Sequence, residues 1–246
     1  MRKTDQIDRM KKTYETYYQR SYSFRKNWFG KITESYIIPK YFSLLEQFIG
    51  NTIIPITLLE LGAGDGEITE IITNKRPNWY MVPTEYTMAG VNSLRKHGFS
   101  NAKVVDAVHL PFKDRSFDYV VSFDVMHHVN GPAKMAYEMI RVAKKGAFLI
   151  EANRQSIFRR ILEKTDIYRR AGEFSYYPIE YKAFFTLPDV STITITPFQF
   201  IPPKLSNISL NFTIGLSETI AKLPLLKWQC SGLAIEVIKT NTSYKT

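Results

Sequence analysis

One segment of the chain restricts its fold more than any other. It reads Ile56-Thr-Leu-Leu-Glu-Leu-Gly-Ala-Gly-Asp-Gly-Glu-Ile-Thr69, an apolar run followed by the glycine loop Gly62-x-Gly64-x-Gly66 and then a helical pattern. Glycine tolerates positive φ and has no Cβ, so the backbone amides of such a loop can approach a ligand closely. The start of the next helix adds its positive end. The segment therefore predicts a strand, a ligand-binding turn and a helix in succession.

The spacing of these glycines excludes two classes of nucleotide site. The dinucleotide fingerprint of dehydrogenases requires Gly-x-Gly-x-x-Gly, but here the third glycine comes one position early and Glu67 stands in its place. No Gly-Lys-Ser/Thr follows, so a phosphate-binding P-loop is excluded as well. Taken alone, a glycine loop of this kind also fits an ordinary tight turn.

The surrounding chain alternates short β-rich runs with helical stretches, which is the pattern of βα units on a mainly parallel sheet. The expected strands are 56–61, 79–84, 102–106, 117–123, 146–151, 191–198 and 232–239. The expected helices are 35–49, 66–73, 87–97, 132–143, 155–170 and 213–222. We find no internal repeat and no long flexible linker, which favours a single domain.

The charge of the chain favours anionic partners. It has 33 Lys and Arg against 23 Asp and Glu, a formal net charge of +10. Residues 1–31 hold nine of the basic residues and three acidic ones, interleaved with aromatic side chains. Such a segment can contact a nucleic-acid strand. It also fits an amphipathic helix whose aromatic face packs on the domain.

Cysteine content and hydropathy bear on the compartment. The lone Cys230 cannot form an internal disulfide or a Cys-rich zinc site, and we expect no metal. No apolar run approaches the ~18 residues of a membrane span. The basic N-terminus has no apolar signal core. We therefore expect a cytoplasmic protein without a transmembrane segment.

Four further motifs follow the glycine loop in order. Glu85 stands just past the second expected strand, and Asp106-Ala107 closes the third. Leu110-Pro-Phe-Lys-Asp-Arg-Ser-Phe-Asp-Tyr-Val-Val121 leads into the fourth strand, and Phe123-Asp-Val-Met-His-His-Val129 follows it. Together these motifs resemble class I S-adenosylmethionine-dependent methyltransferases. The resemblance spans about residues 55–151 and is strongest to the small-molecule branch that includes the quinone-biosynthesis (type 11) methyltransferases.

The resemblance implies a fold and a division of the chain. The fold is α/β, a Rossmann-like seven-stranded, mostly parallel sheet with helices on both faces. One methyltransferase domain would cover residues 1–246. Within it, 1–50 would form an N-terminal helical lid, 53–151 the cofactor-binding core, 152–190 a substrate-side insertion after the fifth strand, and 191–246 the last strands.

The resemblance also implies S-adenosyl-L-methionine as cofactor and assigns roles at its site. Glu60 would position the methionine end and Glu85 would bind the ribose hydroxyls. The complete set of expected cofactor-binding residues is Glu60, Gly62, Ala63, Gly64, Glu85, Tyr86, Asp106, Ala107 and Phe123. The chain departs from the family pattern at Pro83-Thr84, before the expected ribose acid, which puts the geometry of that strand end in question.

The chemistry expected at this site is alignment of an acceptor nucleophile behind the methyl group, with water excluded. A general base helps when the acceptor is a hydroxyl, and His127, His128 and Glu151 are the residues that could serve. The His pair also fits a purely structural part of the family pattern, and Glu151 also fits helix capping. The reaction would be methyl transfer by in-line displacement at the methyl carbon.

The residues after the fifth expected strand indicate the chemical class of the acceptor. Arginines there suit a carboxylate or phosphate, and aromatic side chains suit a planar or lipid-like body. We expect Arg154, Tyr168, Arg169 and Tyr177 on the substrate side of a small-molecule site. A solvated helical face explains the same arginines equally well.

Two other functions compete with this interpretation. The basic charge fits an RNA methyltransferase, although the motif of amino-directed nucleic-acid enzymes is missing after the fourth strand. A regulatory protein could keep the fold and bind the cofactor without turnover. Binding of S-adenosylmethionine with no methyl transfer would distinguish the regulatory protein from the enzyme.

Overall fold

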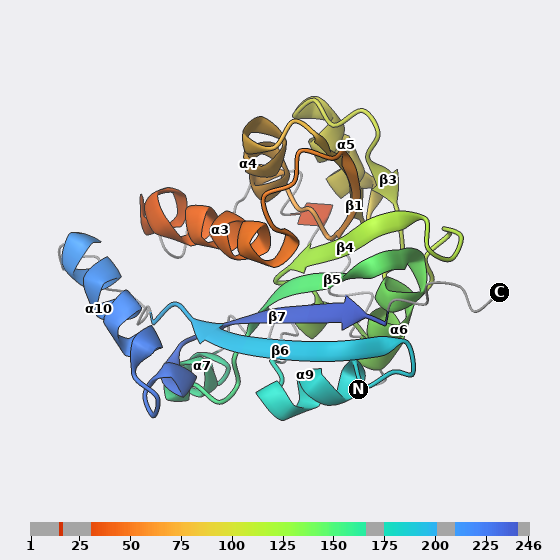
Figure 1. Cartoon of the computed structure of the whole chain (residues 1–246). Helices are drawn as coiled ribbons and strands as arrows, with labels where there is room; N and C mark the ends of the chain where they lie inside the picture. The colour runs from red at the N-terminus through yellow and green to blue at the C-terminus, as the bar shows by residue number, and fades with distance from the viewer. Residues whose placement is uncertain (1–14, 17–30, 166–174, 201–209, 241–246) are drawn as a thin grey trace.

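The computed structural model describes residues 15–16, 31–165, 175–200 and 210–240, whose strands form one seven-stranded sheet (Figure 1). The strands are β1 (Ile56–Leu61), β2 (Trp79–Glu85), β3 (Lys103–Val104), β4 (Phe117–Phe123), β5 (Ala143–Ala152), β6 (Val190–Phe198) and β7 (Gly232–Lys239). Their order in the sheet is β3-β2-β1-β4-β5-β7-β6. All pairs are parallel except those of β7, which runs antiparallel to both neighbours. The predicted α/β class and sheet are confirmed.

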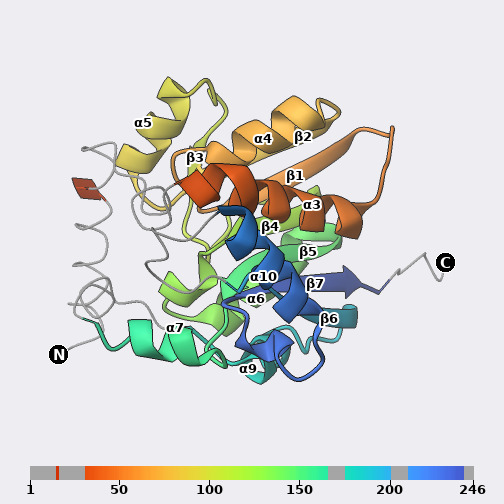
Figure 2. The same cartoon turned by 90° about the vertical axis from the view of Figure 1, so that its left-hand side faces the viewer.

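Helices cover both faces of the sheet (Figures 1 and 2). They are α3 (Ile38–Ile49), α4 (Glu67–Lys75), α5 (Met88–Lys96), α6 (Pro132–Val142), α7 (Ile157–Leu162), α9 (Pro178–Phe184) and α10 (Leu210–Lys222). A π-helical turn, η1 (Thr33–Ile37), leads into α3, and two 3₁₀ turns are η2 (Met126–His128) and η3 (Lys227–Gln229). Helices α3 and α4 lie on one face of the sheet, and α6 and α9 lie on the other (Figure 2).

The central strands are apolar because both of their faces are covered. In β1, Leu58 points into the core beneath α3 and α4, and Leu59 points into the core beneath α6. Helix α3 adds an apolar stripe that includes the buried Phe42 and Leu45. The alternation of side chains along each strand thus fixes which helix packs on which face.

Two segments expected on the acceptor side pack on the sheet in the part that the structure describes. Helix α9 was not predicted, and its Tyr181, with Phe185 just after it, is fully buried against the sheet. Part of segment 152–190 therefore packs as a layer on the sheet. Helix α3, from the expected lid, packs on the other face through buried aromatic and aliphatic side chains.

No helix among the described residues is long and apolar enough to cross a membrane. The basic N-terminal region, apart from the short stretch at 15–16 and the residues from 31 on, lies outside the described part of the chain.

The fold brings the functional motifs to one edge of the sheet. Gly62 follows β1, Glu85 ends β2, Asp124 follows β4 and Asn153 follows β5. Parallel strands place their carboxyl ends at the same edge, which is where ligands bind in open α/β sheets. This edge is the place to look for the site.

Candidate active site

The three glycines of the loop serve different purposes. A Cβ at Gly62 would lie 2.5 Å from Cγ2 of Val125, and one at Gly66 would lie 2.7 Å from Cε2 of Phe99. At Gly64, which has a φ of +64°, a Cβ would meet nothing within 4 Å. Close packing therefore requires glycine at two positions. Gly64 alone faces open space, as a loop that receives a ligand must.

Glu85 holds the open part of this loop. Its Oε1 accepts a hydrogen bond from the Gly64 amide at 2.7 Å, and its Oε2 accepts one from the Tyr86 amide at 3.0 Å. A carboxylate offers about four acceptor positions, so it can orient the loop and also accept from the hydroxyls of a ligand. The arrangement places a fixed negative charge beside the open Gly64.

The departure from the family pattern before Glu85 does not disturb the strand. Pro83 lies in register with Glu60 of β1 and has no N–H to give to the ladder. The carbonyl of Glu60 accepts a hydrogen bond from the hydroxyl of Thr84, at 2.7 Å. The carbonyl of Thr84 then accepts from the Ala63 amide at 2.9 Å. Thr84 thus joins β2 to the glycine loop.

The other residues expected at the cofactor differ in position. Glu60 is buried, and its Oε2 accepts from the Thr69 hydroxyl at 2.6 Å, which ties β1 to α4. Asp106 is half-exposed and accepts from the Val108 amide at 3.0 Å. Phe123 packs in the core, with its ring stacked on Tyr41. Its side chain is therefore a core element rather than part of an open pocket.

The remaining two lie near the surface of the same region. Tyr86 is exposed, and Ala107 packs against the core beneath α6. Both follow directly on a residue whose carboxylate is fixed by backbone amides.

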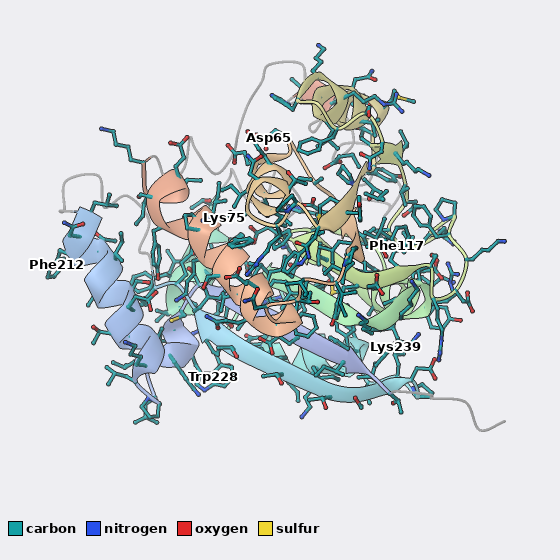
Figure 3. All side chains as sticks on the ribbon, turned by 45° about the horizontal axis from the view of Figure 1, so that its top comes forward. Asp65, Lys75, Phe117, Phe212, Trp228 and Lys239 are labelled. Atoms are coloured by element: carbon teal, nitrogen blue, oxygen red, sulfur yellow. The ribbon has the colours of Figure 1, made fainter. Side chains whose placement is uncertain are left out.

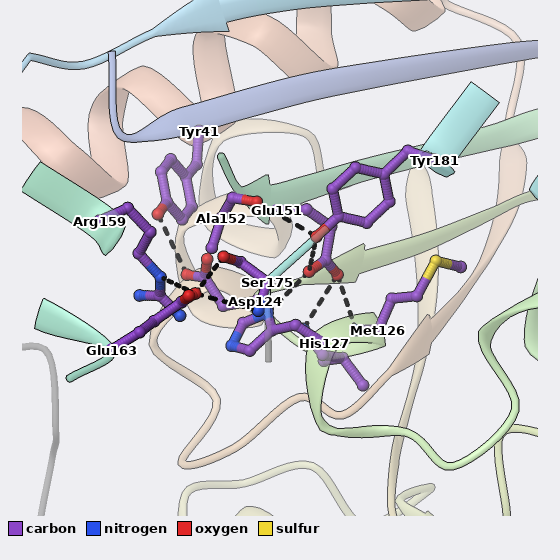
Figure 4. A network of polar contacts seen from close by, with 11 residues as sticks. Tyr41, Asp124, Met126, His127, Glu151, Ala152, Arg159, Glu163, Ser175 and Tyr181 are labelled. Atoms are coloured by element: carbon purple, nitrogen blue, oxygen red, sulfur yellow. Dashed lines mark hydrogen bonds and ion pairs between the residues drawn. The ribbon is translucent and has the colours of Figure 1, made fainter. Parts of the chain in front are cut away.

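A buried carboxylate and a histidine form the strongest polar group at this edge (Figure 4). Glu151, in β5, is fully buried, and its Oε1 accepts from the amides of Val125 at 3.1 Å and Met126 at 2.7 Å. Its Oε2 lies 2.7 Å from Nδ1 of His127. The hydroxyl of Tyr181 lies 3.4 Å from the same Oε2 and donates to the carbonyl of Ala152 at 3.2 Å. Four donors thus surround one carboxylate.

Burial and the charge of Glu151 raise the pKa of Tyr181 well above its ordinary value. The phenol therefore stays protonated and remains a hydrogen-bond donor at any ordinary pH. This keeps the buried carboxylate solvated by protein groups alone.

Glu151 has no exposed surface, which argues against a direct role as general base. Its position instead orients His127. When Nδ1–H of an imidazole donates to a carboxylate, Nε2 is left as the basic nitrogen. His128 stacks against this ring, with centroids 4.0 Å apart and planes tilted by 44°. We call His127 and Glu151 the His–Glu pair.

Asp124 is a site residue that the sequence reasoning missed. It follows β4 with a φ of +60°, and its Oδ2 accepts from the Tyr41 hydroxyl at 3.1 Å. Asp adopts this backbone region more readily than most residues, yet it remains uncommon there. Such conformations gather at functional sites. The sequence places Asp124 directly after an apolar strand, but nothing in it indicates the positive φ.

Two described arginines after β5, the expected Arg154 and the neighbouring Arg159, are engaged by protein groups. Arg154 lies over the ring of Tyr177, 5.6 Å from its centroid, and donates to the carbonyl of Ser175 at 3.4 Å. Arg159 donates to Glu163 at 3.3 Å (Figure 4). Glu163 also accepts from the amide and hydroxyl of Ser175. Tyr168 and Arg169 lie outside the described residues.

Comparison with known proteins agrees with this geometry. Residues 59–150 match the family model described as a methyltransferase domain. A stretch of 97 residues is 31% identical to demethylmenaquinone methyltransferase from Thermobifida fusca, covering 38% of this chain and 41% of that protein. The chain spans less than half the length of the first curated relatives it matches.

Solved structures share the fold at low sequence identity. A SAM-dependent methyltransferase from Archaeoglobus fulgidus is 16% identical, with a TM-score of 0.61 over 88% of this chain and 98% of that one. Phosphoethanolamine N-methyltransferase 2 from Haemonchus contortus, in complex with phosphomonomethylethanolamine and S-adenosylhomocysteine, is 14% identical. Its TM-score is 0.56 over 82% of this chain and 52% of that one.

The glycine loop, the strand order and the matched segment agree with one another. Residues 59–150 therefore form a methyltransferase domain of the type 11 kind, within the fold of the class I S-adenosylmethionine-dependent enzymes.

Proposed function

We propose that this chain transfers a methyl group from S-adenosylmethionine to a small-molecule acceptor, with the His–Glu pair as general base. The observation that carries the proposal is the 2.7 Å contact between His127 Nδ1 and Glu151 Oε2 at the carboxyl edge of the sheet. Val125, two residues before His127, packs on the glycine loop at Gly62. The base and the loop are thus parts of one packed unit.

The cofactor's fit to this chain rests on the loop. Gly64 leaves open space, and Glu85 beside it supplies a carboxylate that suits two ribose hydroxyls. Asp106 and Ala107 would hold the adenine, and Glu60 would fix the loop beneath the methionine end. When bound, the sulfonium supplies a methyl group that is already activated for transfer. The carboxylates nearby tolerate its positive charge.

The His–Glu pair would move the proton of the acceptor. Nε2 of His127 would accept the proton of an acceptor hydroxyl as its oxygen bonds to the methyl carbon and the carbon–sulfur bond of the sulfonium breaks. Glu151 then stabilises the imidazolium through Nδ1–H. Because backbone amides and Tyr181 fix the carboxylate, the imidazole keeps one orientation throughout. The acceptor gains the methyl group and the histidine holds the proton.

The charged and aromatic side chains on the acceptor side indicate the class of acceptor. Arg159 is paired with Glu163, which weakens the case for a strongly anionic acceptor. The half-buried Tyr176 adds aromatic surface beside Tyr181, which favours an aromatic or lipid-like body. Demethylmenaquinone, for which the Thermobifida fusca relative is named, is the first acceptor to test.

Calorimetry followed by a transfer assay tests the proposal. We expect S-adenosylmethionine and S-adenosylhomocysteine to bind in the micromolar range and NADH not to bind. Radiolabelled methyl transfer to demethylmenaquinone, to other aromatic metabolites and to total RNA would then identify the acceptor class. Cofactor binding without transfer to any of these would support a regulatory protein. Transfer to RNA alone would contradict the small-molecule assignment.

A further inference from the structure

The turn between α10 and η3 exposes a group of apolar side chains. Leu223, Leu225 and Leu226 have exposed fractions of 42%, 90% and 48%. They belong to Lys222-Leu-Pro-Leu-Leu-Lys-Trp228, which we call the leucine turn. Single exposed leucines are ordinary, but a contiguous group on one protruding turn indicates an interaction site.

The backbone of the leucine turn is ordered by its own hydrogen bonds. The Leu223 amide donates to the carbonyl of Ile220 at 3.1 Å, and the Lys227 amide donates to the carbonyl of Leu223 at 2.8 Å. Pro224 fixes its φ within the turn. The leucines are therefore held outward by a closed turn, and the domain surface beneath does not cover them.

The charge around the leucines selects the kind of partner. Lys222 and Lys227 flank them, and no acidic residue occurs in the sequence between Glu218 and Glu236. Trp228 follows, with Nζ of Lys227 5.6 Å from its ring centroid. Leucine, lysine and tryptophan together are typical of segments that enter the headgroup region of anionic membranes. The net charge of +10 acts in the same direction.

The leucine turn is fastened to the edge of the sheet that carries the His–Glu pair. Nδ2 of Asn153 donates to the carbonyls of Trp228 at 3.0 Å and Cys230 at 2.8 Å. Asn153 lies two residues beyond Glu151, and the first residue of β7, Gly232, pairs with Ala152. Figure 3 shows Trp228 near one end of α10 and Phe212 near the other. The turn thus projects beside the candidate active site.

We infer that the leucine turn docks the protein on an anionic lipid bilayer, with the leucines at the headgroup–acyl boundary and the lysines on the phosphates. This docking is a property beyond methyl transfer and does not depend on it. It would place the carboxyl edge of the sheet near the bilayer, where an amphiphilic acceptor resides.

Co-sedimentation of the full chain with vesicles tests the inference. We expect binding to vesicles of phosphatidylcholine with phosphatidylglycerol, weak binding to phosphatidylcholine alone, and a decline with added salt. The double variant Leu225→Ser, Leu226→Ser should lower the partition coefficient at least about tenfold, because two large apolar side chains no longer enter the interface. Lys222→Glu with Lys227→Glu should reduce binding to the level of neutral vesicles.

The matched control is Ile53→Ser with Ile54→Ser. These side chains are 93% and 69% exposed, but they precede β1 at the opposite edge of the sheet, so their loss should leave partition unchanged. S-adenosylmethionine affinity of the leucine variant, measured by calorimetry, should match that of the original chain and so report an intact fold.

Three outcomes would overturn the inference. One is no binding to anionic vesicles at low salt. Another is an equal loss in the control and leucine variants. The third is a dimer, seen by analytical ultracentrifugation, that the leucine variant dissociates while vesicle binding is absent, which would assign the turn to a second copy of the chain.

Discussion

The two halves of the candidate active site are built in different ways. On the cofactor side, a single run of sequence from β1 through the glycine loop to α4 supplies the cradle, and Glu85 is joined to it by one hydrogen bond across 21 residues. On the acceptor side, contacts join residues far apart in the chain. Tyr41 meets Asp124 across 83 residues, and Asn153 meets Trp228 across 75. A local motif can therefore reveal the first half, but only tertiary structure assembles the second.

The His–Glu pair belongs to the acceptor side, and replacing its histidine should have the largest effect. His127→Asn removes the proposed base, so kcat should fall by roughly 10²–10⁴-fold while cofactor affinity stays the same. Steady-state kinetics with calorimetry measures both quantities. His128→Asn is the matched control and should change kcat far less. Equal losses in the two variants would assign catalysis to neither ring specifically.

Glu151→Gln tests the orientation of that histidine with almost no change of shape. The amides of Val125 and Met126 must face the Gln oxygen, so its NH₂ group must face His127. Nδ1 then becomes the acceptor, the proton moves to Nε2, and the base is lost through the wrong tautomer. We expect kcat to fall about 10²-fold or more with little change in KM.

Raising the pH distinguishes this tautomer effect from damage to the fold. If His127 of the Glu151→Gln variant is held in the wrong tautomer, kcat should stay low as the pH rises, because no deprotonation restores a basic Nε2. Full recovery of kcat at alkaline pH would contradict the orienting role of Glu151.

The glycine loop allows a sharper test of the cofactor side. Gly64→Ala and Gly62→Ala both place a Cβ at positive φ, which costs roughly 1–2 kcal/mol of stability in each variant. Only Gly62 also meets Val125, so Gly62→Ala should lose about 1–3 kcal/mol more in urea unfolding. Only Gly64 faces open space, so Gly64→Ala should lose cofactor affinity, by about tenfold or more. The reverse pattern would remove Gly64 from the cofactor site.

The same contrast explains what could be predicted from the sequence. The strands 56–61, 117–123 and 232–239 match their predicted bounds because apolar runs end there at a glycine, an acid or a polar segment. The buried role of Glu151 was not predictable, because an acid at a strand end resembles a ligand-binding acid until the packing around it is known. Helix α9 was not predicted because aromatic side chains after the fifth strand were interpreted as a sign of the acceptor site, whereas Tyr181 is buried against the sheet.

A long-range contact between Glu138 and Leu110 fixes part of the cofactor side and predicts an effect of pH on stability. Glu138 in α6 accepts from the Leu110 amide at 2.8 Å, and Arg141 donates to both of its oxygens. Leu110 follows the Asp106-Ala107 motif, so a distant helix anchors the loop proposed to hold the adenine. The hydrogen bonds from Arg141, despite burial, lower the pKa of Glu138 below its ordinary value.

A depressed carboxyl pKa stabilises the fold above the unfolded-state value, near 4.5 for this group, and that stability is lost as the pH falls through the folded-state value. Glu138→Gln should therefore cost about 1–2 kcal/mol at pH 7 and have a smaller effect at an acidic pH low enough to protonate the original carboxyl. Urea unfolding at both pH values measures the difference. An equal loss of unfolding free energy at the two pH values would mean that the shape of the Glu138 side chain, rather than its charge, anchors the loop.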